Sequence, residues 1–403
     1  MLKQEKMKRA AQVLVFFLLL VLSNLALAEQ KTLSNKKIAI QAEKIFTVSH
    51  GTLTDGLILI EKGKISFVGP WKKIPSDSTL IKAKIVIPGL VDTHTHLGAK
   101  SDWNEYSNKE FAGDINPNLN IMDVIDQESP DFSFALSGGV TTVMVTPGSG
   151  NVICGELVIL KTAGKSHQKR VLRNPAGLKM AFDFPQAFKI VSDEFEKTLE
   201  YLTNKKKAGD RGETFEQDLR METIAKVLKR EIPAHIHCIP YYAIENALKL
   251  KKKFNIDIIL EHALEADKVI KKIREGAVPV SFGPLLLKQA ESLPDPIPAL
   301  FEKEGIKFSI HSDAPIVPPN GLLLYAAQAV KYGLSEEAAL RSITLSAAEI
   351  LTINNRVGSI EVGKDADLVL LDGAPFDILT HVEGVLIDGN IVFNEKDFYD
   401  KSK

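Results

Sequence analysis

The sequence predicts an α/β protein: a (β/α)8 TIM-like barrel with a small β-sandwich built from both chain ends. Three observations predict this architecture. Apolar, strand-like segments alternate with amphipathic, helix-like segments from residue 87 to residue 355, a pattern typical of a parallel sheet and, at this length, of a barrel. Short glycine-punctuated β segments flank this region at 36–86 and 356–395. Histidines stand at the ends of several predicted barrel strands.

Residues 1–28 are predicted to be a secretory signal peptide. The basic start MLKQEKMKRA precedes the apolar run AQVLVFFLLLVLSNLALA, which ends in the small-x-small site Ala26-Leu27-Ala28. An uncleaved membrane anchor is the alternative, because the apolar run is close to the length that spans a bilayer. We expect cleavage after Ala28 and an exported protein, periplasmic or secreted, with no membrane attachment after cleavage.

The composition is that of an ordinary globular protein, with 45% hydrophobic and 25% charged residues among 403. A formal net charge of −1 gives no electrostatic reason to expect nucleic-acid binding. Only Cys154 and Cys238 are present, which excludes a disulfide-rich scaffold. Two buried free thiols are favoured over a disulfide between them.

At each end of the chain, a predicted turn joins neighbouring β segments. At the amino-terminal end, KIAIQAEKIFTV is followed by GLILIEKGKISFVG, in which EKGK has the composition of a hairpin turn. At the carboxyl-terminal end, GSIEVGKDADLVLLDG is followed by VEGVLIDGNIVFN, with IDGN as the turn. The predicted barrel strands between them are KIVIPGLVDT, VTTVMVT, GLKMAF, IPAHIHC, FNIDIILEH, AVPVSFG and KFSIHSD. Helix-like segments between these strands include FEQDLRMETIAKVLKR, YYAIENALKLKKKF and EADKVIKKIREG.

The first barrel strand ends in the pair His94 and His96. Residues two apart on a strand point to the same side, so the two imidazoles can converge on one metal ion. Asp92 lies on the same side and could orient one of the rings. The pair alone fits metal-free histidines equally well, so the other strand ends decide between the two interpretations.

The strands IPAHIHC and FNIDIILEH carry further candidate ligands. His237 ends the first of them and is favoured as a metal ligand, whereas His235 is favoured as a buried structural residue. His262 follows an acidic residue at the end of an apolar strand, which leaves the choice between ligand and structural residue open.

GLKMAF and KFSIHSD complete the set of strand ends. Lys179 interrupts an apolar strand, either as half of a salt bridge or, once carbamylated, as a bridge between two metal ions. Asp313 would be costly to bury unless it were paired or bound to metal. His311 lies two residues before Asp313 and could hold the Asp313 side chain in place without binding metal itself.

Several motifs in this order resemble the amidohydrolase superfamily of metal-dependent barrels. They are PGLVDTHTH, the strand-end His237 and His262, the late HSD, and GSIEVGKDADLVLLD. GGVTTVMVTPGSGNVICGELVILKTAG, PAGLKMA and EHALEADKV are most similar to its imidazolonepropionase-like branch. Two departures stand near the expected active site: the chain continues LKMA as FDFP, and Ile239 occupies a position where relatives often have a second histidine.

The resemblance implies a metal-dependent hydrolase that cleaves a C–N bond in an amide, a cyclic amide or a dipeptide. It implies one or two divalent ions, with zinc expected. The implied ligands are His94, His96, Lys179, His237, His262 and Asp313. Asp313 would act as the proton acceptor and donor, and His262 would contact the substrate or water if only one ion is bound.

Two other functions stay open at this point: deamination of a small ring, and a barrel that binds metal or ligand without catalysis. The expected partner is a small-molecule substrate, and a homo-oligomer is open.

Overall fold

The computed structural model describes residues 37–99, 115–285 and 296–395. The predicted signal peptide and its cleavage site lie outside these residues. Within them, no helix combines the length and the apolar character that crossing a membrane requires.

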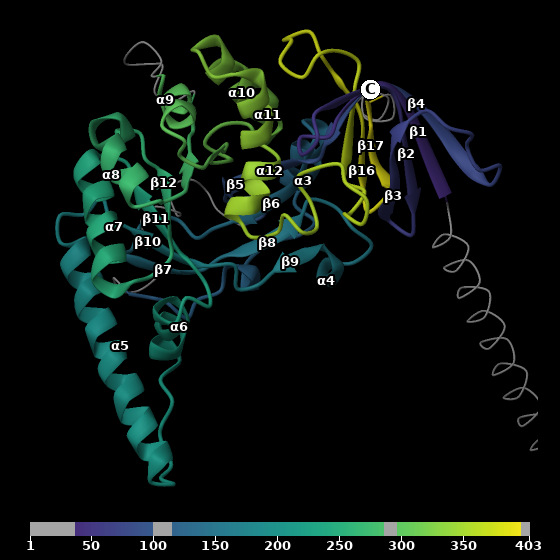
Figure 1. Ribbon diagram of the computed structural model, residues 1–403. Helices are drawn as coiled ribbons and strands as arrows, with labels where there is room; N and C mark the ends of the chain where they lie inside the picture. Colours follow the sequence, from purple (N-terminus) through teal and green to yellow (C-terminus); the bar gives the residue numbers. More distant parts are fainter. Residues whose placement is uncertain (1–36, 100–114, 286–295, 396–403) are drawn as a thin grey trace, which may run out of the picture.

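Both ends of the chain meet in one seven-stranded sheet, ordered β17-β16-β15-β4-β1-β2-β3. Figure 1 shows its amino-terminal strands in purple and its carboxyl-terminal strands in yellow, side by side. The strands are β1 (Lys37–Phe46), β2 (Thr52–Glu61), β3 (Lys64–Pro70), β4 (Ser78–Pro88), β15 (Leu368–Leu371), β16 (Val382–Ile387) and β17 (Asn390–Asn394). The two chain ends therefore pair as predicted, and their strands form one continuous hydrogen-bonded sheet.

The two predicted hairpin turns are present in this sheet. Lys62 and Gly63 join β2 to β3, and Asp388 and Gly389 join β16 to β17. All four residues have positive φ, at 52°, 78°, 48° and 67°. Two successive residues of positive φ are characteristic of the type I′ turn, whose twist matches that of the paired strands, and glycine adopts this conformation without steric cost.

The middle of the chain forms two mixed sheets, so the predicted α/β class is confirmed. The first is ordered β14-β13-β12-β11-β10-β7 and the second β5-β6-β8-β9. Strands β10 to β14 pair in parallel, as do β5 and β6. The bounds are β5 (Leu90–Thr95), β6 (Val140–Val145), β7 (Ile153–Glu156), β8 (Val158–Lys161), β9 (Val171–Arg173), β10 (Leu178–Ala181), β11 (Ala234–Cys238), β12 (Ile258–His262), β13 (Val280–Phe282) and β14 (Phe308–Ile310).

Contacts between β5 and β14 link the two sheets. A parallel bridge joins Thr95 to Ala314, just beyond β14. Behind it, the hydroxyl of Thr93 lies 2.7 Å from that of Ser281 on β13 and 2.8 Å from that of Ser309 on β14. The first and last parallel strands of this region are thereby brought together, an arrangement that the predicted barrel would require.

Helices alternate with these strands and cover them. They are α3 (Pro130–Ser137), α4 (His167–Arg170), α5 (Ala187–Asp210), α6 (Leu219–Leu228), α7 (Tyr241–Phe254), α8 (Ile270–Glu275), α9 (Ile297–Lys303), α10 (Leu322–Lys331), α11 (Glu336–Ser342) and α12 (Leu345–Ile350). Helix α7 buries Ala243, Ile244, Ala247 and Leu250, the spacing of one helical face, and it contacts β11 and β12. The three helix-like segments named in the sequence all contain helices.

A buried cluster of charges ties the terminal sheet to β8. The ammonium of Lys161 lies 2.8 Å from Asp365, 2.9 Å from Asp367 and 2.7 Å from Asp388. Burial raises the pKa of Asp367 to about 6, although Lys161 opposes the rise. Asp365 and Asp367 of GKDADLVLLD therefore stabilise the junction between the chain ends and the middle region. Cys154 and Cys238 are both buried and form no disulfide, which confirms the favoured interpretation.

Candidate active site

Three of the predicted site residues form a compact buried group. One nitrogen of His94, one nitrogen of His262 and one carboxylate oxygen of Asp313 all lie within 4.8 Å of one another. Their exposed fractions are 1%, 3% and 5%. His94 lies on β5, His262 ends β12 and Asp313 follows β14, so three separate strands deliver them to the same end of the parallel array.

His96 lies at the edge of this group, beside Asp313. Nε2 of His96 and Nε2 of His94 each lie 3.4 Å from Oδ1 of Asp313. The two rings are 5.3 Å apart, so the alternation of β5 places them on one side, as predicted. The amide of Asp313 donates to the carbonyl of His94 at 3.1 Å, which holds the carboxylate close to β5.

The three histidines share an arrangement that is typical of metal ligands. In each ring, Nδ1 faces an oxygen: the Glu261 carboxylate at 2.9 Å for His94, the Thr146 carbonyl at 2.8 Å for His96, and the Gly283 carbonyl at 2.9 Å for His262. Ligating histidines commonly engage the other ring nitrogen in this way. The His94 contact is a close electrostatic approach, not an aligned hydrogen bond.

This donor set fits a divalent ion. Imidazole nitrogens with a carboxylate oxygen are ligands that suit zinc. Two atoms that each lie about 2.1 Å from a tetrahedral ion are roughly 3.4 Å apart, which matches the distances from Asp313 to His94 and to His96. Burial lowers the pKa of His94 to about 4 and holds that of His262 well below its usual range, so both rings are neutral at pH 7, as ligation requires.

Asp92 does not orient a ring, contrary to the expectation from its place on the strand. Its carboxylate accepts hydrogen bonds from the backbone amides of His94 at 3.3 Å and Ser312 at 3.2 Å, and from the Ser312 hydroxyl at 2.5 Å. Burial raises the pKa of Asp92 to about 7, against these hydrogen bonds. Asp92 therefore ties together the backbone segments that carry His94 and Asp313.

Glu261 takes the role expected of Asp92, although it was not among the residues predicted from the sequence. Its buried carboxylate contacts Nδ1 of His94, lies 2.9 Å from Nδ1 of His235, and forms an ion pair with the ammonium of Lys179. Burial raises the pKa of Glu261, but His94 and Lys179 outweigh it and hold the pKa well below the usual range. Lys179 is thus half of a salt bridge, one of its two predicted roles, and His235 is a buried structural residue, as favoured.

A signal for Glu261 was present in the sequence. It directly precedes His262 in an otherwise apolar strand, where an ionised side chain must find a partner. Lys179 and His235 are direct register partners on β10 and β11, and His237 is paired with Glu261 across β11 and β12. His235 is in turn the register partner of Ile259, and Glu261, two residues further along β12, lies on the same side of the sheet.

His237 lies beside the compact group and faces another carboxylate. Its ring centroid is 4.4 Å from that of His262, but its Nε2 lies 3.0 Å from Oδ2 of Asp183. Asp183 belongs to FDFP, the stretch noted as a departure from the family pattern. Its other oxygen accepts a hydrogen bond of 2.9 Å from the amide of Ile239, the second departure.

His311 fills the space behind the group. Its ring stacks on His94 at 4.9 Å and lies 5.0 Å from His262. Burial lowers the pKa of His311 to about 3, so the ring is neutral, and neither nitrogen has a hydrogen-bond partner among the described residues. It is packed against the candidate ligands and does not hydrogen-bond to Asp313.

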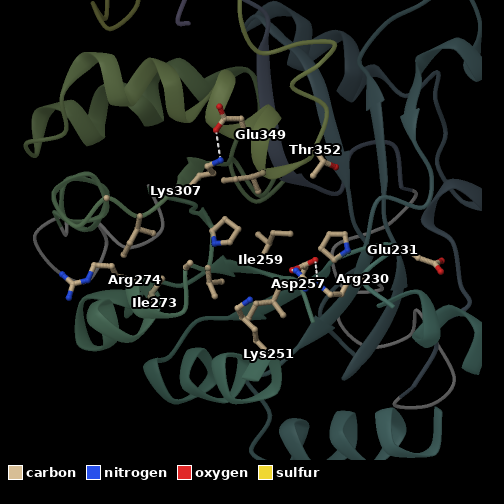
Figure 2. A pocket seen from close by; sticks show the side chains of 18 of the residues that line it. Arg230, Glu231, Lys251, Asp257, Ile259, Ile273, Arg274, Lys307, Glu349 and Thr352 are labelled. Atoms are coloured by element: carbon tan, nitrogen blue, oxygen red, sulfur yellow. Dashed lines mark hydrogen bonds and ion pairs between the residues drawn. The ribbon is translucent and has the colours of Figure 1, made fainter. Parts of the chain in front are cut away.

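A pocket of about 530 Å³ lies at the other end of the strands (Figure 2). Ile258 and Ile259, which begin β12, line it, whereas His262 ends the same strand. Figure 2 shows two ion pairs at its edge, Arg230 with Asp257 and Lys307 with Glu349. This pocket is therefore separate from the histidine group.

Comparison with known proteins places the chain in a family. Residues 85–393 match the model of the "Amidohydrolase family". The chain belongs to the amidohydrolase family. A solved amidohydrolase from Thermotoga maritima MSB8 is 32% identical, with a TM-score of 0.83 over 89% of this chain and 100% of that one.

Further relatives agree with this assignment. Imidazolonepropionase from Shewanella baltica (strain OS223) is 27% identical over 86% of this chain and 93% of its own length. Amidohydrolase tasK from Hapsidospora irregularis is 25% identical over 84% of this chain, and the chain spans 40% of that protein. An adenosine deaminase from Xanthomonas campestris solved with bound zinc shares the fold at 17% identity and a TM-score of 0.55.

This amidohydrolase is a metal-dependent hydrolase that acts on carbon–nitrogen bonds, as the sequence predicted. The predicted resemblance to the imidazolonepropionase-like branch is confirmed as well.

Proposed function

We propose that His94, His96, His262 and Asp313 hold a divalent ion, zinc, and that the protein hydrolyses an amide, a cyclic amide or a dipeptide. The single observation that carries this proposal is the group formed by His94, His262 and Asp313, whose ligand atoms converge within 4.8 Å. When bound, such an ion brings the pKa of a coordinated water to about 7 and polarises a carbonyl group.

Each residue of the group has its own task. Asp313 takes a proton from the attacking water at its carboxylate and passes it to the leaving nitrogen. His262, fixed through Nδ1 to the Gly283 carbonyl, presents its other nitrogen to the ion or to the substrate. Glu261 holds the His94 ring from behind, so that its Nε2 stays directed at Asp313.

Products identify the reaction. We expect a library of amides, cyclic amides and dipeptides, incubated with protein and added zinc or manganese, to yield a new carboxylate and a free amine. Release of ammonia with a ring carbonyl would instead indicate deamination. Tight binding without turnover would indicate a binding protein.

We propose the corresponding domain organisation. Residues 87–355 close into the (β/α)8 barrel, which the bridge from Thr95 to Ala314 and the hydroxyl contacts of Thr93 support. Residues 36–86 and 356–395 form the composite β-domain beside it, supported by their shared seven-stranded sheet.

We propose that the protein is exported and cleaved after Ala28. The basic start, the apolar run and Ala26-Leu27-Ala28 are the basis of this proposal. N-terminal sequencing of protein recovered from an extracytoplasmic fraction should begin at Glu29. A chain there that still begins at Met1 would contradict cleavage.

A further inference from the structure

Lys179 already forms an ion pair with Glu261. Its side chain is fully buried, and its ammonium forms an ion pair with Glu261, the carboxylate that also contacts His94 and His235. A carbamate on Lys179 would place a second anion against the buried Glu261, and like charges that share a buried site are strongly unfavourable. A second ion would therefore need its carboxylate from another residue.

Asp183 is such a carboxylate, and it stands beside an imidazole. Oδ2 of Asp183 lies 3.0 Å from Nε2 of His237. Two atoms about 2.1 Å from one ion and at right angles to each other are roughly 3.0 Å apart, so this pair has the separation of neighbouring ligands. The Ile239 amide fixes Oδ1 at 2.9 Å, which leaves Oδ2 as the oxygen directed at His237.

The surroundings of this pair suit a second ion. The Asp183 and His237 side chains are 30% and 15% exposed, so an ion can reach them from the open end of the strands. The His237 ring adjoins His262 at 4.4 Å, which makes the pair continuous with the compact group. No lysine or arginine forms a salt bridge with Asp183 within the described ranges.

We propose that Asp183 and His237 hold a second divalent ion, with Asp183 supplying the carboxylate in place of a modified Lys179. The inference rests on the proposed function, because it adds an ion to the same site. It also assigns a role to the FDFP stretch, whose aspartate lies two residues after the end of β10 and accepts a hydrogen bond from the residue that follows β11.

A metal count tests the inference without any substrate. Protein is stripped with a chelator, reloaded with zinc, freed of excess metal and analysed for metal per chain. We expect two ions in the parent and one in Asp183→Asn, which keeps the size of the side chain but loses its charge. The matched control is Asp193→Asn, an exposed carboxylate paired with Lys189, which should keep both ions.

Intact mass, measured under gentle conditions on the unaltered protein, tests whether Lys179 is carbamylated. We expect no added mass of carbon dioxide. A mass increase that is lost in Lys179→Met, together with a fall to one ion in that variant, would overturn the inference in favour of the carbamate.

Other outcomes separate the two proposals. One ion in the parent, or two in Asp183→Asn, would overturn the second site and leave the first intact. No ion in the parent would contradict the proposed function itself.

Discussion

Asp313→Asn is expected to keep most of its metal and to lose about 10²-fold or more of its turnover, the scale of general-base loss. Burial raises the pKa of Asp313, but His262, His96 and His94 outweigh it and hold the pKa well below its usual range. The carboxylate is therefore ionised at neutral pH and can accept a proton. Asparagine cannot, although it has the same size and tolerates the positive φ of 58° at this position.

His96→Ala should fail in a different way. His96 has no proton role while its Nε2 binds metal, and its Nδ1 is held by the Thr146 carbonyl. Its removal should lower metal content and turnover together. A metal count and a pH–rate profile on both variants distinguish these patterns once a substrate is known.

Asp372→Asn is the matched control for Asp313→Asn. Asp372 also contacts a histidine, His381 at 3.3 Å, but at the surface and away from the compact group. It should keep the parent turnover. Parent turnover in metal-loaded Asp313→Asn would show that the proton transfer has been assigned to the wrong residue.

Glu261→Leu is expected to lower the free energy of unfolding by about 3–5 kcal/mol, the usual cost of removing one partner of a buried ion pair. The side chains of Lys179 and Glu261 are both fully buried, so the ammonium of Lys179 would lose its carboxylate without gaining water. His94 would also lose the contact at Nδ1, which should weaken metal binding by about 10–100-fold.

Urea unfolding of the metal-free variants measures the stability change. Adding Lys179→Met to Glu261→Leu should recover much of it, because an apolar pair of similar volume leaves no buried charge. The control is Glu245→Gln, which breaks the surface pair with Lys272 and should cost no more than about 1 kcal/mol. A loss in Glu261→Leu no larger than in this control would contradict the role given to Glu261.

Most of the fold prediction rested on hydrophobic periodicity and on the residues typical of turns. The helix predicted from YYAIENALKLKKKF is α7, and the turns EKGK and IDGN occur where they were expected. The division of the middle strands between two sheets was not predicted, because β7 and β8 pair in antiparallel fashion with β10 and β6. Such pairings depend on contacts between strands, which one-dimensional patterns do not record.

Strand-end positions predicted much of the candidate site, but not the partner of each residue. His94, His96, His262 and Asp313 converge as the sequence suggested. Glu261 and Asp183 were not singled out, because each matters through a neighbour on another strand: Lys179 for the first and His237 for the second. The sequence shows which residues end each strand, but register decides which of them meet.

The most direct measurement of the central claim is hydrolysis by stripped and reloaded protein, made on the parent and on His94→Ala with metal counted in the same samples. We predict that the stripped parent is inactive, that zinc or manganese restores release of a carboxylate and an amine in proportion to bound metal, and that His94→Ala recovers neither. Undiminished hydrolysis by stripped parent protein, or full activity in His94→Ala, would contradict a metal-dependent hydrolase centred on His94, His262 and Asp313.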